Sequence, residues 1–254
     1  MNYILHLHAG LTPVLLFLYL FLALVLGMAK AGLSGFGLIV IPSMALIFGA
    51  RSSTGILLPL LLTGDIMAVI YYHRNAVWKY ILMALPWIVI GITTALITGT
   101  RINEHQFKII LSSVVGAMIF LTLVNDLRKK KNDRIPDNHM FSAFMGCTGG
   151  FATMIGNSGG PVFSLYFLSL KLLKNEFIGT GAWLYLIMNT GKLPLHIFIW
   201  KTITFNTFIL NLIAVPFVIT GIFIGVWAVK LFPEKLYRYF IIVATLATAV
   251  LLFI

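Results

Sequence analysis

The sequence predicts an all-α polytopic membrane protein built from two inverted repeats. Its 254 residues are 60% hydrophobic and only 10% charged, with a mean hydropathy of +1.00. Two glycine-rich breaks, residues 32–37 (GLSGFG) and 156–161 (GNSGGP), interrupt apolar runs at equivalent places in the two halves. Each repeat is expected to hold a broken or re-entrant helical hairpin and about three full spans, which gives about 8–10 transmembrane segments.

Composition excludes a soluble globular protein, because soluble domains carry roughly 25% charged residues. The net charge of +11 comes mainly from basic residues in predicted loops. Such clusters are typical of cytoplasmic anchors, so no nucleic-acid partner is expected. Cys147 is the only cysteine and therefore cannot form an intrachain disulfide.

The first repeat is predicted over residues 1–125. Its hairpin, 11–48, is divided by the first break, after which the apolar segment is only about half a membrane thickness long. Full spans follow at 54–72, 77–98 and 106–124. Residues 126–139 form a basic linker, which the positive-inside rule places in the cytoplasm.

The second repeat is predicted over residues 140–254 and follows the same plan. Its hairpin, 141–173, is divided by the second break. Full spans follow at 177–200, 204–230 and 236–254.

The duplication is supported by residues that rarely match by chance. At an offset of 124 positions, Gly32 aligns with Gly156, Ser34 with Ser158, Gly35 with Gly159, Gly55 with Gly179, and Asp65 with Asn189. At an offset of 130, Ala84 aligns with Ala214, Pro86 with Pro216, and Gly91 with Gly221. Five segments per half, or three spans plus a re-entrant hairpin, make an odd number of crossings. The halves are then inverted, the protein is multi-pass in the cell membrane, and, with the linker inside, both termini lie outside. If each break instead interrupts one continuous crossing, the halves are parallel, but the positive-inside rule favours the inverted arrangement.

The two breaks are the candidate binding site. Backbone groups left unpaired inside a membrane survive only where protein or a wet cavity satisfies them. Helix N-termini after the breaks present free N–H groups and a positive dipole end, which suits an anion. The candidate substrate-binding residues are Ser34, Gly35, Phe36, Gly37, Asn157, Ser158, Gly159 and Gly160. The alternative is that these glycines only allow close helix packing.

These breaks and the duplicated halves resemble the sulfite exporter TauE/SafE family. The residues that carry the resemblance are residues 32–37 followed by Pro42, and the counterpart 155–161. The resemblance covers nearly the whole chain. It implies facilitated or ion-coupled movement of sulfite, thiosulfate or an organosulfonate, without enzyme activity or a cofactor. The implied partners are a small anionic substrate, membrane lipids and a coupling ion, H⁺ or Na⁺, and an oligomer is compatible with it.

Four ionisable residues in or beside the spans are further candidates, because such groups usually face the protein interior or a pathway. Lys192 is a candidate cationic ligand for the anion or a partner of Asp65, and the alternative is that it snorkels to the interface. Asp65 and His196 are candidates for carrying a coupling proton or for structural hydrogen bonding. Lys30, beside the first break, either offsets the charge of the anion or lies at the headgroups.

Two other functions remain open from the sequence. Residues 32–35 (GLSG) resemble the Gly-x-Ser-Gly of rhomboid intramembrane proteases, in which Ser34 would be the nucleophile and His196 its base. The recurrence of serine at Ser158 favours a transport hairpin instead. The second alternative is a membrane subunit that does not itself transport. No metal site is expected.

Overall fold

The computed structural model describes residues 12–33, 36–101 and 139–233, together with single positions and short pieces at 103, 106, 109, 113, 235–237, 239, 240 and 243. Ser34, Gly35 and most of the linker and of the spans expected at 106–124 and 236–254 lie outside the described residues.

The first half contributes four α-helices. They are α2 (Pro13–Lys30), α3 (Gly37–Phe48), α4 (Ala50–Tyr72) and α5 (Trp78–Arg101), with the 3₁₀ turn η2 (His73–Asn75) before α5. α2 begins at a proline, where a missing N–H does no harm, and the Thr12 hydroxyl accepts a bond from Leu15 N at 3.3 Å. α4 begins four residues earlier than the expected span, so that Arg51 lies in its first turn.

The second half repeats this order. It contains α7 (His139–Gly156), α8 (Gly159–Ser169), α9 (Lys174–Pro194) and α10 (Phe205–Leu231), with the π-helical segment η3 (Leu195–Ile199) after α9. The expected span 177–200 is therefore an α-helix as far as Pro194, and its last turn is a wider π-helical turn that begins directly after Pro194. A π-helical turn of this kind often marks a functional part of a helix.

Both predicted breaks separate two helices. At the first break, Gly32 has a φ of 117°, a conformation that glycine tolerates far better than other residues. At the second, Asn157 has a φ of 54°, in the left-handed region that asparagine adopts more readily than most residues. Each break thus contains a left-handed residue of a type that tolerates this conformation.

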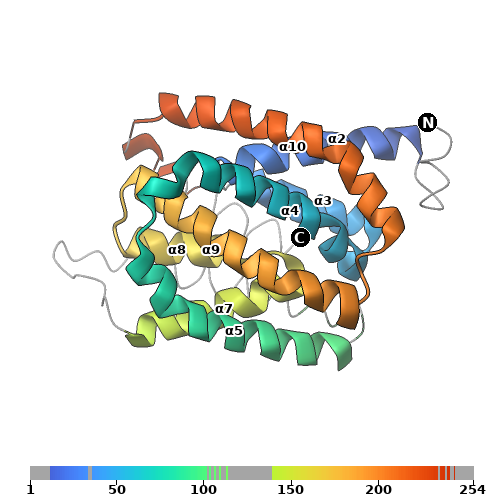
Figure 1. The fold of residues 1–254 in the computed structure, drawn as a ribbon, viewed down its shortest axis with the longest axis horizontal. Helices are drawn as coiled ribbons and strands as arrows, with labels where there is room; N and C mark the ends of the chain where they lie inside the picture. The colour runs from blue at the N-terminus through green and yellow to red at the C-terminus, as the bar shows by residue number, and fades with distance from the viewer. Residues whose placement is uncertain are drawn as a thin grey trace.

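The helices of the two halves pack reciprocally. α2 packs against α10, α7 packs against α5, and α4 packs against α9. In Figure 1, α2 and α10 run along one edge of the molecule and α5 and α7 along the opposite edge, with α4 and α9 between them. This exchange of partners is what a twofold relation between equivalent helices would produce.

Equivalent glycines allow the closest of these approaches. A Cβ atom on Gly91 of α5 would collide with the carbonyl oxygen of Cys147 in α7. Its counterpart Gly221 in α10 would collide in the same way with the carbonyl oxygen of Leu24 in α2. Such contacts between small residues and backbone are the usual means of packing helices tightly in a membrane.

Four of the described helical segments are long and apolar enough to cross a membrane. They are Pro13–Lys30, Arg51–Asn75, Trp78–Arg101 and Phe205–Leu231. α2, α5 and α10 expose large apolar side chains such as Phe17, Val89 and Phe223, as lipid-facing helices do. α9 instead contacts α4, α5 and α8, and it carries the buried polar residues Asn189 and Lys192. The described part of the chain is thus an all-α membrane protein with a polar centre.

Candidate functional site

The polar centre is built around Asp65 on α4 and Asn189 on α9. Asp65 is fully buried, and its Oδ2 accepts a bond of 2.6 Å from Asn189 Nδ2. These are the two residues that align at the 124-position offset, so equivalent positions of the two halves meet in space. A buried carboxylate is stable only when it is paired and hydrogen-bonded, and Asn189 supplies one of the bonds.

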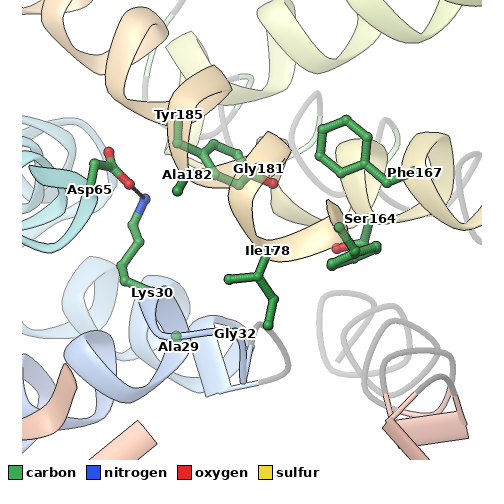
Figure 2. A pocket seen from close by; sticks show the side chains of 11 residues that line it. Ala29, Lys30, Gly32, Asp65, Ser164, Phe167, Ile178, Gly181, Ala182 and Tyr185 are labelled. Carbon is green, nitrogen blue, oxygen red and sulfur yellow. Dashed lines mark hydrogen bonds and ion pairs between the residues drawn. The ribbon is translucent and has the colours of Figure 1, made fainter. Parts of the chain in front are cut away.

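Lys30, in the last turn of α2, supplies the ion pair. Its Nζ donates to Asp65 Oδ1 at 2.6 Å, and it lies 4.6 Å from the centroid of the Tyr185 ring. Figure 2 shows Lys30 reaching from α2 to Asp65 beside Tyr185. The Lys30 side chain remains 12% exposed, whereas that of Asp65 is fully enclosed. Asp65 is the one acceptor recorded for Lys30 within the described chain, so up to two of the three ammonium N–H groups remain for a ligand.

A cavity of about 50 Å³ adjoins this pair (Figure 2). Its polar lining is supplied by Lys30, Asp65, Ser164 and Tyr185. The rest of its lining is apolar or glycine, and consists of Ala29, Gly32, Phe167, Phe177, Ile178, Gly181 and Ala182. The cavity therefore lies between the end of α2 at the first break and the facing helices α8 and α9.

Lys192 lies at the second break and is fully buried. Its Nζ donates to Thr153 O at 3.0 Å, to Thr153 Oγ1 at 3.0 Å and to Asn157 Oδ1 at 2.8 Å. An ammonium has three N–H donors, and here all three are directed to protein oxygens. In this structure Lys192 neither snorkels to the interface nor pairs with Asp65, and it has no donor left for direct contact with an anion.

The other residues expected at the second break are occupied by hydrogen bonds within the protein. The Ser158 hydroxyl donates to Ala152 O at 3.0 Å, and the Asn157 amide donates from Nδ2 to Thr54 O at 3.0 Å. Gly159 and Gly160 form the first turn of α8, and Gly160 O accepts a bond of 3.4 Å from the Tyr185 hydroxyl. None of these four residues lines the cavity.

At the first break, Phe36 precedes α3 and Gly37 begins it. The Phe36 ring packs against Phe240, with 6.4 Å between ring centroids, and not against the cavity. Of the candidates predicted from the sequence, the structure brings Lys30 and Asp65 to the cavity and leaves Phe36, Gly37 and Lys192 away from it.

His196 lies in η3, beside a second, larger cavity. Its Nδ1 is 2.8 Å from Thr202 Oγ1, and its ring meets Trp200 edge to face at 5.1 Å between centroids. Thr202 and Trp200 line a cavity of about 460 Å³, together with Arg51, Ser52, Ile56, Lys201, Thr204 and Thr207. This lining is basic, and Arg51 lies over the Trp200 ring at 5.4 Å.

Most lining residues of the smaller cavity were not among the sequence candidates, and they include Ser164, Phe167, Phe177 and Tyr185. Tyr185 precedes Asn189 by four residues and Lys192 by seven, which places all three on one helical face. That spacing could have identified Tyr185 from the sequence. Ser164 and Phe167 had no comparable signal, because α8 is buried nearly all round.

The centre holds two lysines, Lys30 and Lys192, and Asp65 is the one carboxylate among the buried residues that the structure describes. A small anion in the cavity beside Lys30 would lie within reach of Lys30 and Ser164. No group of three potential metal ligands among His, Cys, Asp and Glu occurs in the described part of the chain.

Comparison with known proteins identifies a family for the chain. The family model described as Sulfite exporter TauE/SafE matches residues 19–252, which is nearly the whole chain. No curated protein and no solved structure gives a significant match.

Proposed function

Since the chain belongs to the sulfite exporter TauE/SafE family, whose members are membrane permeases and not enzymes, we propose that it is a secondary transporter of a small sulfur oxyanion. Sulfite, thiosulfate and a short organosulfonate are the proposed substrates. The proposed binding site is the cavity beside Lys30. The observation that carries this proposal is a partly exposed lysine that lines a small cavity and gives only one recorded bond, to Asp65, within the described chain.

Lys30 suits this role because one bond holds its ammonium group in place while other N–H groups remain for a ligand. Asp65 fixes the ammonium through one bond of 2.6 Å, and Asn189 fixes Asp65 in turn. The ammonium therefore needs little rearrangement to bind an anion, which lowers the entropy lost on binding. A bond between an ammonium and an oxyanion is charge-assisted and stronger than a neutral one.

The size and lining of the cavity favour a small substrate. A volume of about 50 Å³ holds about three to four water-sized groups, which is the heavy-atom count of a sulfite-sized oxyanion. Phe167, Phe177 and Ile178 form an apolar wall opposite the charged pair. This wall accommodates the sulfur or a short carbon chain while the oxygens face Lys30 and Ser164.

The repeated architecture supplies a route for alternating access. We propose that the halves are inverted and rock about the contact between α4 and α9, where Asp65 and Asn189 meet. In many secondary transporters, broken helices of inverted repeats line a midplane site in this way. In the proposed orientation the linker 126–139 lies in the cytoplasm of a cell-membrane protein, and Asp65 or His196 carries any coupling proton.

The family match gives no support to the rhomboid protease alternative, because the matched family is a transporter family. The other alternative is a membrane subunit that does not itself transport. A measurement of substrate flux by the purified protein distinguishes it from the proposed transporter.

The proposal is tested by sulfite flux into proteoliposomes that contain the purified protein. Wild-type protein should accelerate flux over empty liposomes, and Lys30→Gln should abolish most of the acceleration while the protein remains monodisperse. Lys235→Gln, at an exposed lysine, is the matched control and should leave flux unchanged. Absence of flux for sulfite, thiosulfate and short organosulfonates with the wild-type protein would overturn the proposal.

A further inference from the structure

The cage around Lys192 consists of three neutral oxygens. One is a backbone carbonyl and one a hydroxyl, both from Thr153, and the third is the amide oxygen of Asn157. The ion pair recorded within the described chain joins Asp65 to Lys30, and no carboxylate is recorded for Lys192. Neutral oxygens of these types are hard ligands, which suit a small cation in general and not an ammonium alone.

The cage lies at the C-terminal end of a broken helix. Thr153 is in the last turn of α7, which ends at Gly156, and Asn157 follows directly. The C-terminal end of a helix carries a partial negative charge from its aligned peptide dipoles. In transporters with broken helices, such ends and the unwound carbonyls beside them hold the coupling cation.

The orientation of the cage is fixed from the other repeat. Asn157 Nδ2 donates to Thr54 O on α4 at 3.0 Å, so that its Oδ1 must face Lys192. The backbone N–H of Asn157, whose φ is 54°, also donates to Thr153 O at 3.0 Å. The amide oxygen of Asn157 and the carbonyl oxygen of Thr153 are therefore held in place by contacts that do not depend on Lys192.

The first repeat has no such cage. At the 124-position offset, Thr153, Asn157 and Lys192 align with Ala29, Leu33 and Ala68, whose side chains offer no oxygen. The cage is thus a property of the second break alone and not a general consequence of the repeated fold.

We infer that Thr153 and Asn157 form a binding site for a small monovalent cation, and that the Lys192 ammonium fills this site as a tethered cation. The transporter consequently works without sodium. The statement that transport needs no sodium rests on the transport function proposed above. The site itself does not, because a cation can be detected there without any substrate.

The test is to remove the tether and offer free cations. Lys192→Ala vacates the cage, so Na⁺ or NH₄⁺ should bind to it, whereas the bulky choline cation should not. Thermal unfolding of the purified variant is compared in sodium, ammonium and choline chloride at equal concentration without substrate. Binding at saturating cation should raise the unfolding midpoint by about 5 °C in sodium or ammonium relative to choline.

Two control variants separate the cage from general salt effects. Lys192→Met fills the same space without a charge and should show no difference between the three salts. Adding Thr153→Val to Lys192→Ala removes a ligand and should abolish most of the shift. If Lys192→Ala is not monodisperse in choline, the yield of monodisperse protein in sodium against choline becomes the readout, and an equally low yield in both would contradict the inference.

The wild-type protein provides a further test that needs no substitution. Its unfolding midpoint and its sulfite flux should be the same in sodium and choline. Sodium-dependent flux by the wild-type protein, or the same midpoint for Lys192→Ala in all three salts, would overturn the inference. A sodium-specific shift in Lys192→Ala together with absent wild-type flux would refute the proposed transport and leave the cation site standing.

Discussion

The two breaks of this protein place a lysine differently. At the first break Lys30 pairs with a carboxylate, remains 12% exposed and lines a cavity. At the second break Lys192 is fully buried and gives all three N–H groups to neutral oxygens. The two breaks therefore differ in their surroundings, since the first leaves a lysine available to a ligand and the second encloses one.

A few residues account for this difference between the two breaks. Asp65 and Asn189 occupy equivalent positions, yet one is charged and the other neutral, and they bond to each other at 2.6 Å. Burying a carboxylate needs a cationic partner, and Lys30 meets that need. Asn189 is neutral and gives Lys192 no counter-charge at the equivalent position, and the end of α7 holds Lys192 instead.

The largest expected effect comes from removing Asp65, the one buried carboxylate among the described residues. Asp65→Asn leaves Lys30 without its counter-charge and should lower the free energy of unfolding by about 3–5 kcal/mol. It should also abolish flux. Unfolding in detergent and proteoliposome flux measure the two effects.

The double variant Lys30→Met/Asp65→Asn removes the pair as a unit. It should regain much of the lost stability but none of the flux, because the anion ligand is gone. A double variant less stable than Asp65→Asn would show that Lys30 does not depend on Asp65 as the structure indicates.

The similarity of the two halves is tested at Gly91 and Gly221, where helices approach each other most closely. Gly91→Ala and Gly221→Ala each drive a methyl group into a backbone carbonyl, and each should destabilise the protein by about 1–3 kcal/mol. Gly191→Ala is the matched control, since a Cβ there meets no atom within 4 Å. Thermal unfolding of the three variants checks this, and strongly unequal effects at Gly91 and Gly221 would contradict a common framework.

The difference between the two breaks predicts opposite outcomes for two polar residues. Ser164→Ala removes a donor from the cavity and should raise the KM for flux roughly tenfold with little change in stability. Asn157→Gly keeps the left-handed turn but removes a cage oxygen, and should lower stability by about 1–3 kcal/mol with KM nearly unchanged. The reverse pattern would move the anion site to the second break.

The smallest effect is expected at the larger, basic cavity. Arg51→Gln removes one of its charges and should raise the KM about twofold at low ionic strength by weakening attraction of the anion. Because salt screens such attraction, the difference should vanish at high ionic strength. An effect of Arg51→Gln that is independent of salt would show that Arg51 acts by other means.

The sequence was sufficient for the helical membrane class and for the two breaks. Gly32 and Asn157 both adopt left-handed conformations at the predicted breaks. Glycine and asparagine adopt such conformations more readily than other residues, so their presence in an apolar run indicates where a helix is interrupted. The sequence could not decide which lysine meets Asp65. That choice depends on the rotation and depth of α2 and α9, which apolar periodicity does not specify in helices buried on most sides.

The position of the cavity was likewise beyond the sequence. Glycine and serine at the second break suggested an anion site there, but Ser158 donates to Ala152 and Asn157 is shared between Thr54 and Lys192. Hydrogen-bond partners from distant segments occupy these groups, and a single sequence does not reveal them. Tyr185 could have been found from its helical spacing to Asn189 and Lys192.

The most direct test of the central claim is the position of a bound oxyanion. Crystals of the protein soaked with selenite, the heavier analogue of sulfite, would locate it by anomalous scattering. The account predicts a peak in the cavity within hydrogen-bonding distance of Lys30 Nζ and near Ser164. A peak at the start of α8, beside Ser158 and Gly159 and away from Lys30, would contradict it.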